Sequence, residues 1–178
     1  TKAMRACSRR MRCALSPSAS TAPFSISSIS ARTLASLSRR DAVTAATAQD
    51  AYAENVTTLF EVLDELEERL STRRYLSGER ITEADWRLFT TLVRFDPVYV
   101  GHFKCNIRRI ADYPNLQGYL QDLYQVAGVA ETVNMRHIKE HYYRSHTMIN
   151  PTGVVPVGPV LALDVPHPGR GRHGPRRP

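Results

Sequence analysis

The sequence predicts an all-α domain, and three observations support that fold class. Between residues 47 and 148 the apolar residues recur at three- and four-residue steps, which is the period of an amphipathic helix. No stretch in this range alternates apolar and polar residues as a half-buried strand does. A helix-start signal also precedes the most apolar stretch of the chain.

Residues 48–70 are predicted to form the first helix, followed by a polar linker at 71–80. Acidic side chains fill most positions between the apolar ones, so one face of the helix is apolar and the other is charged. The apolar face, which we expect to pack on the core, consists of Val56, Leu59, Phe60, Leu63, Leu66 and Leu70.

The second helix is predicted at 83–95 and is expected to lie at the centre of the domain. Thr82 and Asp85 have the spacing of a capping box, in which each side chain satisfies a backbone N–H of the other residue. The helix that follows is apolar on nearly every side, which favours a buried position. Pro97 is expected to end or kink it, because proline lacks the N–H that an α-helix needs.

Two further helices are predicted at 115–125 and 134–144, with a short turn at 129–133 between them. Pro114 favours the start of the first of these helices, since proline is well tolerated in a first turn. After Asn150 the density of proline and glycine rises sharply, which predicts an extended segment rather than another helix.

The composition divides the chain into three parts. Residues 1–46 are rich in Ser, Ala and Arg and too poor in apolar residues to form a core, so we expect low order there. They are interpreted either as an organellar transit peptide or as a segment that is not natural protein, such as the misread start of a longer gene. Residues 47–150 form the predicted helical domain, and residues 151–178 form a Pro/Gly-rich tail.

The net charge of +7 does not indicate a nucleic-acid-binding domain. Residues 1–44 carry +7 and residues 151–178 carry +3, whereas residues 45–150 carry −3. No apolar run approaches the roughly 20 residues of a membrane span. The three cysteines form no even disulfide framework, so we expect a cytoplasmic protein, or an organellar one if the N-terminal segment is a transit peptide.

Two blocks of sequence are more specific than helix periodicity requires. Residues 82–106 read TEADWRLFTTLVRFDPVYVGHFKCN, and residues 128–153 read GVAETVNMRHIKEHYYRSHTMINPTG. Together they closely resemble the C-terminal domain of glutathionyl-hydroquinone reductases, which are Xi-class, omega-like members of the glutathione S-transferase superfamily. The resemblance extends from about Thr47 to about His167.

The resemblance implies a glutathione-dependent reductase of two domains. In this family a thioredoxin-like domain binds glutathione and carries a nucleophilic cysteine in a Cys-Pro-Trp motif. The helical domain covers the hydroquinone side of the site and forms the homodimer contact. Glutathione is a co-substrate, no cofactor is bound permanently, and no metal is used. The cysteine removes glutathione from a glutathionyl-hydroquinone through a mixed disulfide, which a second glutathione resolves.

This sequence departs from the family pattern ahead of residue 47. Residues 1–44 contain no βαβ pattern and no Cys-Pro-Trp, and the family's tyrosine before the first helix is missing from residues 41–46. We therefore expect the thioredoxin-like domain to be absent and the chain to be truncated and inactive by itself. The alternative is a non-catalytic helical module that dimerises or binds a quinone-like ligand.

The resemblance assigns a role to Tyr99 and Tyr142. In the family, tyrosine hydroxyls at these positions approach the catalytic sulfur, and a phenol that donates to a thiolate lowers the pKa of the thiol. The alternative is that both are half-buried core tyrosines with satisfied hydroxyls. They lie on different predicted elements, so the residue pattern alone does not bring them together.

The three thiols are not expected to serve as the nucleophile. Cys105 has Lys104, Arg108 and Arg109 nearby, which would lower its pKa, but a structural thiol is the favoured interpretation. Cys7 and Cys13 lie among arginines and are expected to be reactive but not catalytic.

Three other features carry weaker expectations. His137 and His141 have a spacing that can hold a metal, yet no third ligand accompanies them, since His146 falls beyond the expected helix end. Trp86 is expected to pack in the core rather than stack on a ligand. The charged residues that flank Phe95, Arg94 and Asp96, either form local ion pairs or line the cleft.

Overall fold

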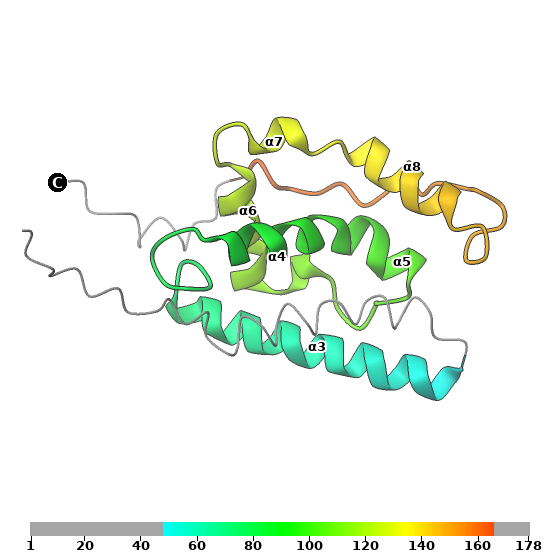
Figure 1. Cartoon of the computed structure of the whole chain (residues 1–178), viewed down its shortest axis with the longest axis horizontal. Coiled ribbons are helices and arrows are strands. Elements are labelled where there is room, and N and C mark those ends of the chain that lie inside the picture. Colours follow the sequence, from blue (N-terminus) through cyan, green and yellow to red (C-terminus); the bar gives the residue numbers. More distant parts are fainter. Residues whose placement is uncertain (1–47, 166–178) are drawn as a thin grey trace, which may run out of the picture.

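A computed structural model describes residues 48–165 of the chain (Figure 1). These residues are helical and contain no β-strand, which confirms the predicted all-α fold class. No helix in this part of the chain is both long enough and apolar enough to cross a bilayer. The predictions for residues 1–46 and for the end of the tail, 166–178, lie outside the described residues.

Helix α3 (Gln49–Thr72) forms one side of the domain, as predicted for residues 48–70. It is 24 residues long and packs against helix α6 (Pro114–Tyr124). Its buried face is the apolar stripe seen in the sequence, extended by one residue: Val56, Leu59, Phe60, Val62, Leu63, Leu66 and Leu70.

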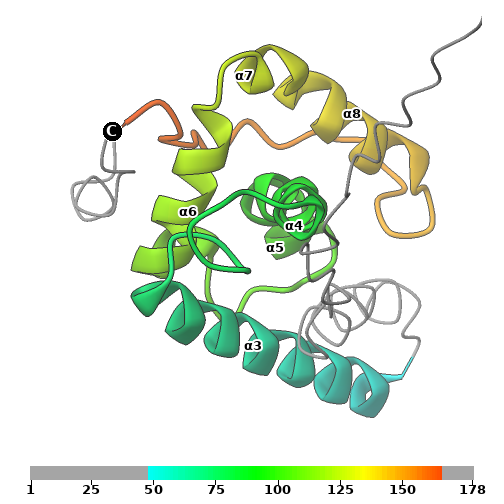
Figure 2. The same cartoon turned by 60° about the vertical axis from the view of Figure 1, so that its left-hand side comes forward.

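Helix α4 (Glu83–Arg94) lies at the centre of the domain, with α3, α6 and the later helices arranged around it (Figure 2). Leu88 is completely buried and Leu92 is 1% exposed, which confirms the predicted central position. Burial on all sides explains why this stretch is apolar nearly all round rather than along a single stripe.

Pro97 was expected to end or kink this helix, and the regular α-helix does end at Arg94, although the chain remains helical beyond it. A π-helical turn, η1 (Phe95–Tyr99), continues from α4, and one more turn, α5 (Val100–His102), follows it. The Val100 N–H donates to the Phe95 carbonyl, five residues earlier, in the manner of a π-turn. The wider turn accommodates a proline that would clash inside a regular α-helix.

The buried carboxylate of Asp85 caps the start of α4. Thr82 and Asp85 form the predicted capping box, and Asp85 Oδ2 accepts from both the N–H and the hydroxyl of Thr82, each at 2.7 Å. The other oxygen, Oδ1, accepts from the Leu76 N–H at 2.9 Å and from the Tyr119 hydroxyl at 2.9 Å. Asp85 is 0% exposed, so it joins the linker, α4 and α6 from inside the core.

The start of α6 is capped by a residue from α3. The Glu67 carboxylate accepts from the backbone N–H groups of Asn115 and Leu116, both at 2.8 Å, and from the Asn115 side chain at 2.8 Å. An anion at a helix N-terminus satisfies unpaired N–H groups and complements the helix dipole. This contact fixes α6 against α3.

Helices α7 (Val129–Thr132) and α8 (Met135–Ser145) cover the far side of α4, and residues 151–165 run back alongside α8 toward α6 (Figure 1). Lys139 of α8 is buried, and its Nζ donates to the carbonyls of Val157 (2.8 Å) and Gly158 (3.0 Å). At the other end of the segment, Gln121 of α6 donates to the Ala162 carbonyl at 2.7 Å. The extended segment is therefore held at two points.

Replacing the buried carboxylate should be far more costly than replacing an exposed one. We expect Asp85→Asn to lower the free energy of unfolding by about 3 kcal/mol, because an amide NH₂ would face buried donors that the carboxylate now satisfies. The measurement is equilibrium denaturation of the whole chain.

The matched control for that substitution is Glu83→Gln, which makes the same chemical change in the first turn of α4. The Glu83 side chain is 78% exposed and pairs only with Arg87, an arrangement that contributes little to stability. Equal losses of stability in the two variants would contradict the role assigned to Asp85.

Candidate functional site

The two tyrosines singled out from the sequence lie beside each other. Tyr99 belongs to the π-turn and is 1% exposed, whereas Tyr142 lies on α8 and is half-buried. Their ring centroids are 6.1 Å apart and the rings are nearly perpendicular, at 80°. The Tyr142 hydroxyl makes no hydrogen bond to another residue in the range 48–165, so it is available to a ligand.

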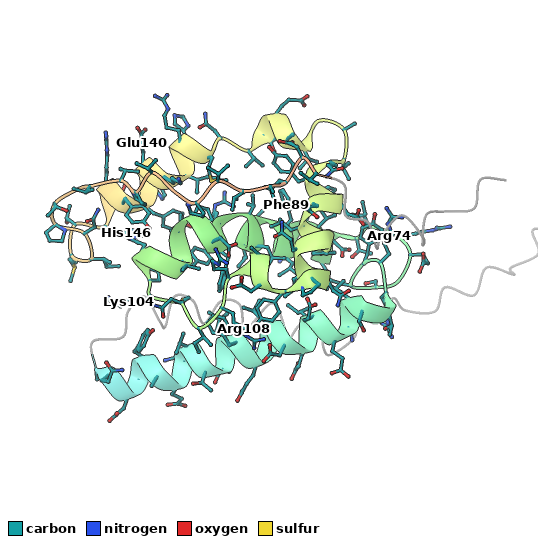
Figure 3. The ribbon with its side chains drawn as sticks, turned by 180° about the vertical axis from the view of Figure 1, so that it is seen from behind. Arg74, Phe89, Lys104, Arg108, Glu140 and His146 are labelled. Carbon is teal, nitrogen blue, oxygen red and sulfur yellow. The ribbon has the colours of Figure 1, made fainter. Side chains whose placement is uncertain are left out.

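Four more rings surround this pair, and we call the six residues the aromatic cluster: Tyr99, His102, Phe103, Tyr142, Tyr143 and His146. Phe103 contacts both tyrosines, with centroid distances of 5.5 Å to Tyr99 and 5.8 Å to Tyr142. His146 stands 5.6 Å from Tyr142 on the other side. Figure 3 shows His146 and Lys104 at the same end of the molecule, where α5 and α8 meet.

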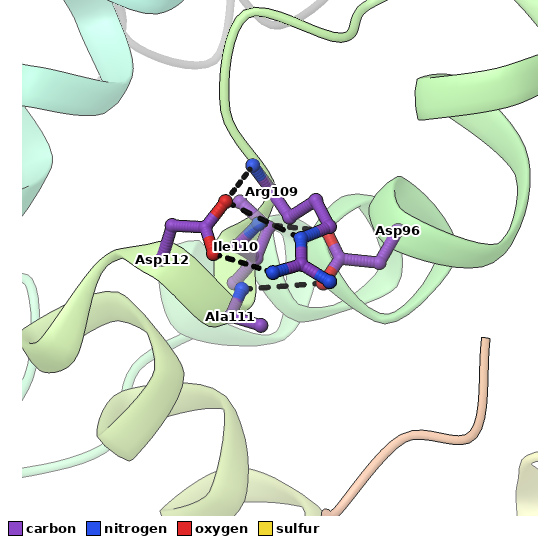
Figure 4. A network of polar contacts seen from close by, with 5 residues as sticks. All are labelled: Asp96, Arg109, Ile110, Ala111 and Asp112. Carbon is purple, nitrogen blue, oxygen red and sulfur yellow. Dashed lines mark hydrogen bonds and ion pairs between the residues drawn. The ribbon is translucent and has the colours of Figure 1, made fainter.

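Asp96 holds the chain that returns from this cluster to the core (Figure 4). Its carboxylate accepts from the N–H groups of Ile110 at 2.7 Å and Ala111 at 3.2 Å, and so caps the 3₁₀-helix η2 (Ile110–Asp112). Burial raises the pKa of Asp96 against the opposing effect of these two hydrogen bonds. The sequence left open whether this residue lines the cleft, and the structure assigns it a structural role.

Arg94, the other charged residue beside Phe95, makes a local contact. Its guanidinium donates to the Thr90 carbonyl, one helical turn earlier. It therefore neither pairs with Asp96 nor reaches the aromatic cluster. The two charged residues that flank Phe95 therefore stabilise helix α4 and the loop before η2 rather than contact a ligand.

Cys105 is a structural thiol, as predicted. It is 0% exposed, and burial raises its pKa to about 12, so the neighbouring cations do not produce a thiolate. Its backbone N–H donates to the Tyr99 carbonyl at 2.9 Å, which closes the loop after α5 against the π-turn. The predictions for Cys7 and Cys13 lie outside the described residues.

Tyr143 docks α8 onto the π-turn through a close approach to Gly101. A Cβ atom at Gly101 would lie 2.9 Å from the Tyr143 hydroxyl oxygen, so a larger residue there would have to displace that oxygen. The hydroxyl also approaches the Pro97 carbonyl at 3.5 Å. Burial raises the pKa of Tyr143, which keeps the phenol protonated. This contact sets the position of the adjacent Tyr142.

The remaining candidates are two exposed histidines and a partly buried tryptophan. His137 and His141 are exposed on α8, and no group of three or more potential ligands within residues 48–165 could hold a metal ion. Trp86 is half-buried against the core and packs edge-on against Phe89 at 6.0 Å. This agrees with the predicted packing role for Trp86.

Sequence reasoning missed His102, Phe103 and Tyr143 as neighbours of the tyrosine pair. A signal was present, because residues three and four positions apart on a helix share a face. His102 and Phe103 follow Tyr99 by three and four residues, and His146 follows Tyr142 by four. The helix end predicted at 144 set His146 aside, and the end or kink expected at Pro97 left Tyr99, His102 and Phe103 without a predicted helix.

Comparison with known proteins supports the resemblance. Residues 49–122 match the family model described as "Glutathione S-transferase, C-terminal domain". The glutathionyl-hydroquinone reductase YqjG of Escherichia coli is 60% identical over 122 residues, which cover 68% of this chain and 37% of YqjG. The chain thus spans little more than a third of that relative's length.

Solved structures agree. The glutathione-bound structure of YqjG matches with a TM-score of 0.76 and 52% identity, covering 80% of this chain and 47% of YqjG. A Xi-class glutathione transferase from Natrialba magadii matches with a TM-score of 0.74 and 47% identity, covering 76% of this chain and 42% of the other.

The helical part of the chain is therefore a glutathione S-transferase C-terminal domain. Its relatives within that superfamily are glutathionyl-hydroquinone reductases and Xi-class glutathione transferases, which confirms the predicted resemblance.

The thiol of Cys105 should be inert while the domain is folded. In a variant with Cys7 and Cys13 replaced by Ser, we expect no reaction with a disulfide reagent at pH 8 during the time in which the unfolded chain reacts completely. The measurement is absorbance of the released thiol, and the same variant in guanidinium is the control. Fast stoichiometric reaction in native buffer would show that the thiol is accessible.

The close approach of Tyr143 to Gly101 predicts a strong coupling between the two positions. Gly101→Ala should lower the free energy of unfolding by about 1–3 kcal/mol, because the added methyl meets the hydroxyl oxygen. In the double variant with Tyr143→Phe the oxygen is absent, so the loss should be smaller than the sum of the single losses. Additive losses measured by thermal unfolding would contradict this contact.

Proposed function

We propose that this chain supplies the helical, hydroquinone-facing domain of a glutathione-dependent reductase that acts on glutathionyl-hydroquinones. The observation that carries the proposal is the pairing of Tyr99 and Tyr142, at 6.1 Å, within a domain that matches the reductase YqjG at 60% identity. The hydroxyl of the half-buried Tyr142 offers a polar contact to a ligand at the edge of the aromatic cluster.

The proposed reaction removes glutathione from the aromatic ring in two steps. A cysteine thiolate attacks the glutathionyl sulfur, the bond between that sulfur and the ring carbon breaks, and the carbon takes up a proton. The products are the free hydroquinone and a protein–glutathione mixed disulfide. A second glutathione then attacks the mixed disulfide, which returns the thiol and releases oxidised glutathione. The ring carbon is reduced, while the thioether sulfur of the substrate and one glutathione thiol are oxidised to a disulfide, so the electrons balance.

The two tyrosines would act on the sulfur rather than on the ring. A phenol that donates a hydrogen bond to a thiolate stabilises its charge and lowers the thiol pKa. The π-turn places Tyr99 next to α8, and the contact between Tyr143 and Gly101 holds α8 at the distance that Tyr142 requires. The half-buried Tyr142 can then address a sulfur at the edge of the aromatic cluster, with the buried Tyr99 packed beside it.

The sulfur itself would have to come from outside residues 48–165. Cys105, the cysteine in this range, is buried with a pKa near 12 and does not reach the cluster surface. We therefore propose that the chain alone does not turn over substrate, that its ligands are glutathione and quinone conjugates, and that it forms a homodimer through the helical domain in the cytoplasm. A non-catalytic ligand-binding module remains the alternative.

An assay of glutathione-dependent hydroquinone release tests this proposal. The chain alone should not exceed the uncatalysed rate, whereas a hybrid that carries the N-terminal portion of YqjG ahead of residue 47 should be active. In the hybrid, Tyr142→Phe should lower kcat/KM by about tenfold, the effect of losing one hydrogen bond to a charged group.

The matched control is Tyr124→Phe, which removes a half-buried phenol on α6, away from the cluster. It should leave kcat/KM unchanged. Equal effects of the two substitutions, or release by the chain alone at an enzymatic rate, would contradict the proposal. Binding of a hydroquinone conjugate by an inactive hybrid would favour the ligand-binding alternative.

A further inference from the structure

Two histidines that are 44 residues apart in the sequence meet at the end of the aromatic cluster. His102 Nε2 lies 3.1 Å from His146 Nδ1, which is a hydrogen-bonding distance. The rings are close to parallel, at 28°, with centroids 5.2 Å apart. His102 is 4% exposed, whereas His146 is partly exposed to solvent.

The contact depends on how many protons the two rings carry. A hydrogen bond between imidazoles needs one N–H and one unprotonated nitrogen, so the pair tolerates its neutral state and its singly protonated state. When both rings are protonated, two N–H groups face each other and both rings are positive. The hydrogen bond is then lost and the two charges repel.

His146 is the centre of the turn that joins α8 to the extended segment. Its N–H donates to the Tyr142 carbonyl at 3.3 Å, and its carbonyl accepts from the N–H groups of Ile149 at 3.0 Å and Asn150 at 2.9 Å. The Asn150 side chain in turn donates to the Tyr143 carbonyl at 2.8 Å. Whatever holds the His146 ring therefore holds this turn and the last residues of α8.

We propose that the His102–His146 pair is a pH-sensitive contact that ties the C-terminal turn of α8 to α5, and that the turn opens when both imidazoles are protonated. The proposal does not rest on the proposed reductase function. If it is correct, acid loosens the segment that carries Tyr142 while the core around α3 and α4 remains folded.

The charged and titratable groups around the pair favour opening in acid. Lys104 follows His102 on its own loop, and α8 contributes His141, whose ring lies 6.4 Å from that of His146, together with Tyr142 and Tyr143. The ion pairs among residues 48–165 lie elsewhere, so no carboxylate is paired with either ring. A second proton on the pair would have no neighbouring counter-charge in this part of the chain.

The sign of the pH dependence follows from the environment of His102. Burial, then His146 and Lys104, lowers the pKa of His102 below its ordinary value of 6.5. The open state therefore binds protons more readily than the closed state. The closed contact is fully stable above about pH 6.5 and loses stability as the pH falls toward the lowered pKa of the folded state.

Hydrogen exchange of the whole chain, followed by mass spectrometry at pH 7.5 and pH 5 and corrected for intrinsic rates, tests the proposal. Protection of residues 142–153 should fall by about tenfold at pH 5, the ratio that corresponds to one hydrogen bond, while that of residues 56–66 in α3 stays constant. His146→Asn and His102→Gln each replace one bonding nitrogen with an amide that does not titrate. Both should abolish the acid loss, which is the fall in protection of residues 142–153 at pH 5.

His137→Asn is the matched control, since it removes an exposed histidine of α8 that lies further from the pair than His141 does. It should retain the acid loss of the unsubstituted chain. If His146→Asn also lowers the protection of α3, the result from His102→Gln decides whether the proposal holds. The proposal would be overturned if residues 142–153 of the unsubstituted chain were equally protected at both pH values, or were unprotected at pH 7.5. It would also be overturned if the variants lost as much protection in acid as the unsubstituted chain. A failed hydroquinone assay with the acid loss intact would overturn only the proposed function.

Discussion

The buried carboxylate of Asp85 is the constraint on which the rest of this domain depends. It accepts four hydrogen bonds, from the Leu76 N–H, from the N–H and hydroxyl of Thr82, and from the Tyr119 hydroxyl. A buried charge is tolerated only when its lone pairs are satisfied, so these donors and the carboxylate require one another. The linker, α4 and α6 are fixed by this one group, and α4 then serves as the axis around which the remaining helices pack (Figure 2).

The candidate site depends on how the central helix ends. The π-turn at Phe95–Tyr99 keeps the chain helical past Pro97, and it presents Tyr99 and His102 toward α8. Asp96 secures the returning loop from the inside (Figure 4), and Tyr143 secures α8 from the outside. An irregular turn held on both sides is a common way to place functional side chains on a rigid element. The relative positions of Tyr99 and Tyr142 are therefore set by contacts to the core.

Local signals in the sequence predicted the helices, whereas contacts between distant residues decided what the sequence could not show. The capping box is visible as Thr82 and Asp85, but nothing local reveals that Tyr119 also donates to that carboxylate. The cap of α6 by Glu67, 48 residues earlier, is likewise a tertiary contact. Pro97 predicted an end or kink of the central helix, but nothing local reveals that the chain continues through a π-turn and a further helical turn to His102. The resemblance singled out Tyr99 and Tyr142, and only the fold showed that they meet.

Native-state hydrogen exchange of the Leu76 and Thr82 amides tests most directly whether Asp85 holds the fold. Both amides donate to this carboxylate, and neither lies inside a helix. If the carboxylate is the central constraint, both should exchange only through global unfolding, with the same free energy as the fully buried Leu63 amide in α3. Exchange of the linker amides through a local opening, at a free energy well below that of Leu63, would contradict the account.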